Sequence, residues 1–97
     1  MKQTTEIVEI LRAYKSVARE EYGITRLGLF GSVARGQHHE GSDVDVCFEG
    51  GTPTLLTLAR IELALERLMG CRVHVTMYHD GLPERMKENI NNEAIWI

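Results

Sequence analysis

Two acidic residues, Asp43 and Asp45, lie two positions apart in the segment DVDVCF (43–48). The segment alternates polar and apolar residues, which is typical of a half-buried strand, and residues two apart on a strand leave the same face. Two carboxylates about 5 Å apart repel by roughly 3 kcal/mol at an effective dielectric constant of about 20. A proton or a cation removes this repulsion. Mg²⁺ suits the pair, because it binds one or two carboxylates together with substrate phosphates.

Gly31 and Ser32 precede this acidic pair, separated from it by ten residues. Because glycine has no Cβ, the backbone at Gly31 can approach a phosphate closely, and nearby N–H groups and the Ser32 hydroxyl can donate to its oxygens. Taken alone, an Asp-x-Asp strand is more often a solvated sheet edge, and a Gly-Ser pair is a weaker signal still. Their combination in this order favours a site for a metal and a phosphorylated ligand.

The segment LFGSVARGQHHEGSDVDV (29–46) resembles the signature of the nucleotidyltransferases of the DNA polymerase β superfamily, specifically the minimal branch. That signature is Gly-Ser, a spacer of about ten residues and Asp-x-Asp, and the Arg35-Gly36 pair also matches its usual form. The resemblance covers nearly the whole chain. It implies transfer of a nucleoside monophosphate, AMP from ATP above all, to an acceptor hydroxyl with release of pyrophosphate.

The resemblance also implies roles for individual residues. Gly31 and Ser32 would bind the phosphates of the nucleotide, with Arg35 neutralising their charge or, alternatively, standing as a solvated helix residue. Asp43 and Asp45 would be catalytic and would hold Mg²⁺, as in two-metal phosphoryl-transfer sites.

His74 marks a departure from the family pattern. Catalytic members carry a third carboxylate in a pattern like Val-Asp-Leu-Val after the second long helix, whereas this chain reads Val-His-Val-Thr at 73–76. Imidazole offers nitrogen where Mg²⁺ prefers oxygen, so a second metal should bind more weakly. His74 is therefore either a catalytic base, since its ordinary pKa suits proton abstraction at neutral pH, or a substitution that lowers or abolishes turnover.

The hydrophobic pattern predicts an α/β (α+β) fold in one domain, 1–97, with helices packed on a small mixed β-sheet. The predicted order α-β-α-β-α-β-α consists of helix 5–22, strand 24–30, a helical turn at 33–35, strand 43–48, a helix begun by Thr52 and Pro53 and ended by Gly70, strand 72–77, and a helix from Pro83 toward Asn91. The residues predicted to form the buried stripes of the two long helices are Ile7, Ile10, Leu11, Tyr14, Val17 and Ala18, and Leu55, Leu58, Ile61, Leu65 and Leu68.

Charge and composition limit the partners. The formal charge is −3, from 11 Lys and Arg against 14 Asp and Glu, which argues against stable binding of duplex nucleic acid. Two cysteines, Cys47 and Cys71, are too few for a disulfide framework and are expected to be buried thiols. The sequence has no apolar run as long as a membrane span and no signal-peptide pattern at its start. We therefore expect a cytoplasmic protein with no membrane partner.

This chain of 97 residues shows no obvious domain that would bind the acceptor. The resemblance implies that a partner presents it, in this family often a HEPN-domain toxin, with the nucleotidyltransferase acting as antitoxin. An alternative is a binding module that neutralises its partner by forming a complex, and a nucleotide sensor would share the same site. The sequence leaves homo-oligomerisation open.

Overall fold

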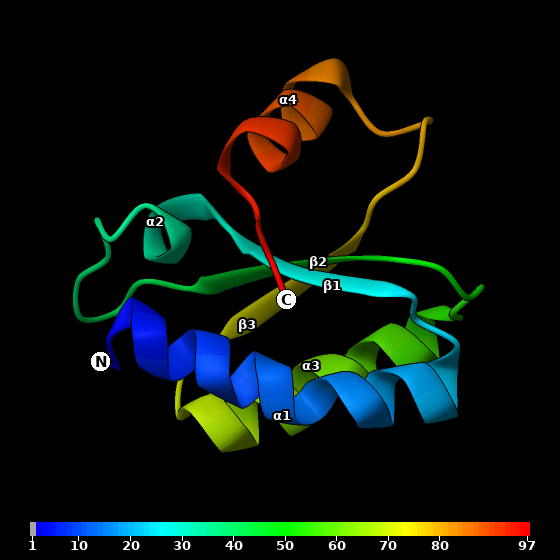
Figure 1. The fold of residues 1–97 in the computed structure, drawn as a ribbon, viewed down its shortest axis with the longest axis horizontal. Helices are drawn as coiled ribbons and strands as arrows, with labels where there is room; N and C mark the ends of the chain where they lie inside the picture. The colour runs from blue at the N-terminus through cyan, green and yellow to red at the C-terminus, as the bar shows by residue number, and fades with distance from the viewer. Residues whose placement is uncertain (1) are drawn as a thin grey trace.

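The chain forms a four-stranded sheet with helices on both faces (Figure 1). The computed structural model describes residues 2–97. Along the chain the elements are α1 (Thr4–Tyr22), β1 (Arg26–Phe30), α2 (Gly31–Ala34), β2 (Val44–Glu49), α3 (Leu55–Met69), β3 (Val73–Met77), α4 (Glu84–Glu93) and β4 (Ile95–Trp96).

The sheet is mixed, with strand order β3-β2-β1-β4. β2 runs parallel to β3 and antiparallel to β1, and β4 runs antiparallel to β1. The parallel pair requires a crossover, which α3 supplies between β2 and β3. The predicted fold class is therefore confirmed, while β4 adds a strand that the sequence did not predict.

The main hydrophobic core lies between the sheet and the long helices α1 and α3, which cover the same face (Figure 1). From β2, Val44, Val46 and Phe48 point into this core and are fully buried. The alternation predicted for this strand is therefore real, and it directs Asp45 to the opposite face. Among the described residues, no helix is both long enough and apolar enough to cross a membrane.

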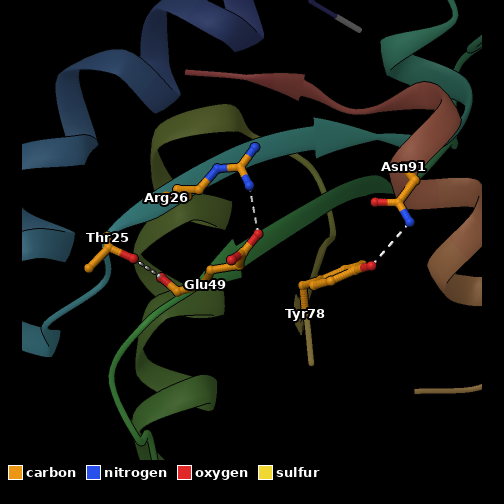
Figure 2. Close-up of polar contacts among 5 residues, drawn as sticks. All are labelled: Thr25, Arg26, Glu49, Tyr78 and Asn91. Carbon is orange, nitrogen blue, oxygen red and sulfur yellow. Dashed lines mark hydrogen bonds and ion pairs between the residues drawn. The ribbon is translucent and has the colours of Figure 1, made fainter. Parts of the chain in front are cut away.

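A smaller cluster packs α4 against the opposite face of the sheet, around Phe30, Cys47 and Ile90. Asn91 of α4 donates from Nδ2 to the Tyr78 hydroxyl at 3.0 Å, as Figure 2 shows. Both cysteines are free; Cys47 is buried, and burial raises its pKa to about 12, whereas Cys71 is only partly buried. The packing around Phe30, Cys47 and Ile90 and the hydrogen bond of Asn91 hold α4 on this face of the sheet.

A cross-strand ion pair contacts this cluster through Trp96. Arg26 on β1 lies opposite Glu49 on β2, and their side chains are 2.8 Å apart (Figure 2). The same guanidinium lies 3.8 Å from the centre of the Trp96 ring, which is a cation–π contact. Trp96 also packs against the second hydrophobic cluster.

The predicted start of α3 is wrong by two residues. Thr54 is the N-cap, and its hydroxyl accepts from the Thr57 N–H at 3.2 Å. The Gly50-Gly51 turn before it packs against the end of α1 and against Thr25. Thr52 and Pro53 therefore connect this packed turn to the N-cap of the helix.

Three residues predicted as buried are in fact exposed. Leu55 is 86% exposed, Leu68 is 52% exposed and Val17 is 38% exposed. In α3 the fully packed row is spaced by four residues, Ile61, Leu65 and Met69, so Leu68 lies beside the row and Leu55 belongs to a first turn outside the core.

The burial of α3 predicts different costs for two leucines on this helix. Leu65→Ala should lower the free energy of unfolding by about 2–5 kcal/mol, because it leaves a cavity in the core. Leu63→Ala, at a residue 54% exposed, should change it by less than about 0.5 kcal/mol. Urea denaturation followed by circular dichroism measures both, and equal losses would contradict the assigned helix face.

Candidate functional site at the end of β1

The corner between β1 and α2 brings the backbone of Gly31 against the side chain of Asp45. Gly31 has φ +76°, and a Cβ built there would collide with the Asp45 carboxylate. The two residues are neighbours because Phe30 pairs with Asp45 in the β1–β2 register. Glycine is needed here both for the left-handed backbone and for this close approach.

Asp43, Asp45 and His74 gather on the same side of the sheet. His74 on β3 is the register partner of Asp45 on β2, and its Nε2 lies 2.9 Å from Oδ2 of Asp43. A carboxylate can only accept, so the imidazole Nε2–H is the donor. In the neutral imidazole this places the free lone pair on Nδ1.

A cavity of about 580 Å³ lies at this corner. Its wall includes Gly31 and Ser32 from α2, Arg35 at the end of that helix, Asp45 from β2 and His74 from β3. The sixth predicted residue, Asp43, instead borders an adjacent cavity of about 760 Å³. The hydrogen bond from His74 joins Asp43 to the first cavity.

The electrostatics of Asp45 favour a bound cation. Burial raises the pKa of this carboxyl above its usual value, the charges of His74 and Arg35 oppose the rise, and those of Asp43 and Glu93 add to it. A positive charge beside Asp45 would offset the cost of keeping it ionised.

The donor set fits a magnesium ion that arrives with a nucleotide. Asp43 and Asp45 could supply hard oxygen ligands, and Mg²⁺ uses one or two carboxylates with substrate phosphates completing its shell. Among residues 2–97, no three His, Cys, Asp or Glu side chains are arranged to hold a metal ion by themselves.

Arg35 and Gly31 share an acidic partner that no local sequence pattern indicates. One oxygen of Glu93 lies 2.9 Å from Arg35 Nη1, and the other accepts from the Gly31 N–H at 3.2 Å. Arg35 also donates from Nε to Gln37. Glu93 is the last residue of α4 and belongs to no recognisable motif.

Comparison with known proteins decides the family. Residues 11–97 match the model of the nucleotidyltransferase domain. The chain belongs to this nucleotidyltransferase family. Protein adenylyltransferase MntA of Thermococcus cleftensis is 36% identical over 93 residues, covering 95% of this chain and 93% of that protein. MJ1217 of Methanocaldococcus jannaschii, a candidate protein adenylyltransferase, is 34% identical over the full length of both.

Solved structures agree with this family assignment. A candidate minimal nucleotidyltransferase superposes with a TM-score of 0.79 at 36% identity, covering 97% of this chain and 95% of that one. A toxin–antitoxin structure with AMP-PNP superposes with a TM-score of 0.73 at 16% identity, covering 98% of this chain and 72% of that one, which shows the shared fold. The chain is therefore a nucleotidyltransferase, and the resemblance read from its motif is confirmed.

Replacing Gly31 with alanine tests the contact with Asp45, and Gly36 is the matched control. Both have a left-handed backbone, but a Cβ at Gly36 meets nothing within 4 Å. Gly36→Ala should cost about 1–2 kcal/mol of unfolding free energy from backbone strain. Gly31→Ala should cost about 1–3 kcal/mol more, because it also displaces Asp45. Equal losses of unfolding free energy in the two variants, measured by urea denaturation, would show that Gly31 and Asp45 are not in contact.

Proposed function

We propose that this nucleotidyltransferase transfers AMP from ATP to a hydroxyl group of a partner protein. The observation that carries the proposal is the contact of the Gly31 backbone with Asp45, beside His74 and Asp43. Hydrogen-bond donors that would bind phosphate thus lie next to carboxylates that would bind a metal ion. The adenylyltransferase names of the relatives support adenylate as the transferred group.

The triphosphate would lie in the cavity at the end of β1. The Ser32 hydroxyl, the Gly31 N–H and the Arg35 guanidinium provide the donors at its wall. Charged hydrogen bonds from a guanidinium to phosphate are short and strong, so Arg35 would contribute most of the charge compensation from the protein.

Asp43 and Asp45 would hold Mg²⁺ against the phosphates. Bound there, the ion would neutralise phosphate charge and make the α-phosphorus a better electrophile. The protein's own contribution is to fix the two carboxylates: Asp45 by the sheet register and the Gly31 backbone, Asp43 by the hydrogen bond from His74.

The proposed reaction forms one bond and breaks one. The acceptor oxygen attacks the α-phosphorus of ATP, and the bond from that phosphorus to the oxygen bridging to the β-phosphate breaks. Pyrophosphate leaves with the electron pair. The proton of the acceptor hydroxyl passes to Nδ1 of His74, whose orientation is set by the Nε2–H···Asp43 hydrogen bond.

A second candidate function rests on the same histidine. Because His74 stands where catalytic relatives carry an acid, the chain would bind its partner and neutralise it without efficient transfer. In both cases we infer a HEPN-type helical partner, and the similarity in fold to toxin–antitoxin structures supports a partner protein. The two functions differ in whether AMP becomes covalently attached.

A transfer assay tests the proposed activity. The chain, coexpressed and purified with the product of the neighbouring reading frame, is incubated with Mg²⁺ and ATP labelled on the α-phosphate. We expect label on the partner, and at least about a 100-fold slower rate with Asp45→Asn, because a metal ligand is lost. Asp80→Asn, an exposed aspartate outside the site, should leave the rate unchanged. An unlabelled partner in a proven complex would contradict the proposal.

Substitutions at His74 separate the two candidate functions. If the imidazole takes the proton, His74→Ala should slow transfer by about 100-fold or more and His74→Asp should not improve it. If His74 has silenced the site, the parent should be inactive and His74→Asp should gain activity. Binding of the partner, measured by size-exclusion chromatography, should be unchanged in both variants.

A further inference from the structure

The carboxylate of Glu93 is held by two of the groups proposed above to bind phosphate. Its Oε2 accepts from the Gly31 N–H at 3.2 Å, and its Oε1 lies 2.9 Å from Arg35 Nη1. Its side chain is only 22% exposed and lines the same cavity as Ser32 and Asp45. A negatively charged group of this chain therefore already fills part of the anion-binding corner.

The chemistry of this contact matches that of a bound phosphate. A carboxylate and a phosphate are both anions that accept from backbone N–H groups and from guanidinium, and two anions cannot use the same donor geometry at once. Asp43 and Asp45 lie nearby, so a further negative charge needs Arg35 beside it to be tolerated. Glu93 and an incoming phosphate therefore require the same compensating charge.

The position of Glu93 is fixed by elements on both sides of it in the chain. Before it, Ile90 is fully buried and Asn91 is bonded to Tyr78 (Figure 2). After it, β4 pairs with β1 at Leu29. The backbone at Glu93 is thus anchored beside the site, and the side chain is held there by its contacts with Gly31 and Arg35.

We propose that Glu93 is an internal competitor that sets the affinity of the site for nucleotide: the triphosphate binds only when this carboxylate releases Gly31 and Arg35. The inference rests on the proposed function, because it requires these groups to bind phosphate. The apparent dissociation constant for ATP then equals the intrinsic one divided by the fraction of molecules in which Glu93 has released Gly31 and Arg35.

Glu93→Gln tests the competition directly. Glutamine keeps the shape of the side chain and removes the charge that pairs with Arg35. We expect Mg²⁺-ATP to bind about tenfold more tightly, and inorganic tripolyphosphate to gain similarly, as measured by calorimetry. Glu88→Gln, an exposed glutamate on the same helix, should leave both dissociation constants unchanged. Unchanged or weaker binding in Glu93→Gln would overturn the inference, and weaker binding would instead make Glu93 a positioning residue for Arg35.

Two further arms keep the outcome decisive. If Glu93→Gln does not fold, Glu93→Asp is used; its shorter side chain cannot hold both donors, and a failure to tighten ATP binding would equally overturn the inference. The wild-type protein separates the two proposals. If it binds Mg²⁺-ATP with the affinity of Glu93→Gln, only the competition is wrong, whereas absence of ATP binding in every folded variant would overturn the phosphate site as well.

Discussion

The close approach of the Asp45 carboxylate to the Gly31 backbone is the constraint on which the site depends. It fixes where β1 ends, because no residue with a Cβ fits there without displacing the acid. α2 begins at the same glycine and, with its C-cap, places Ser32 and Arg35 at the wall of the cavity. A local steric condition at one glycine thus brings an acidic strand and a cluster of donors together.

The sheet register links this arrangement to the stability of the fold. Val44 and Val46 are fully buried between the sheet and the long helices, and the intervening Asp45 must therefore face the other side. The parallel pairing of β2 with β3 places His74 beside it. A slip of one residue would bury the carboxylate and expose the valines, so the hydrophobic core itself enforces the geometry of the site.

Local patterns in the sequence were enough to predict most of the fold and which of the candidate site residues lie close together. Residues close together in the chain form these patterns: the alternation in DVDVCF, the Gly-Ser pair and the helical stripes. The structure places around one cavity Gly31, Ser32, Arg35, Asp45 and His74. The start of α3 depends on the packing of the Gly50-Gly51 turn against the end of α1, whereas the exposure of Leu68 depends on which row of the helix reaches the core. β4 has two residues, too few for a periodic signal.

Glu93 shows most clearly what local patterns cannot predict. It contacts Gly31 across 62 positions of sequence, and only the path of α4 over the sheet brings it there. The same holds for the hydrogen bond of His74 to Asp43, which spans 31 positions. Parity predicted the face on which His74 lies, but not the atom that it would contact.

We propose that Asp43 and Asp45 bind a divalent ion together with the triphosphate that Gly31, Ser32 and Arg35 hold. The most direct measurement is the affinity for ATP with and without Mg²⁺, in the wild-type protein and in the Asp43→Asn/Asp45→Asn double variant. We expect Mg²⁺ to strengthen ATP binding to the wild-type protein and to have no such effect on the double variant. A double variant that folds and keeps the Mg²⁺-dependent affinity would contradict it.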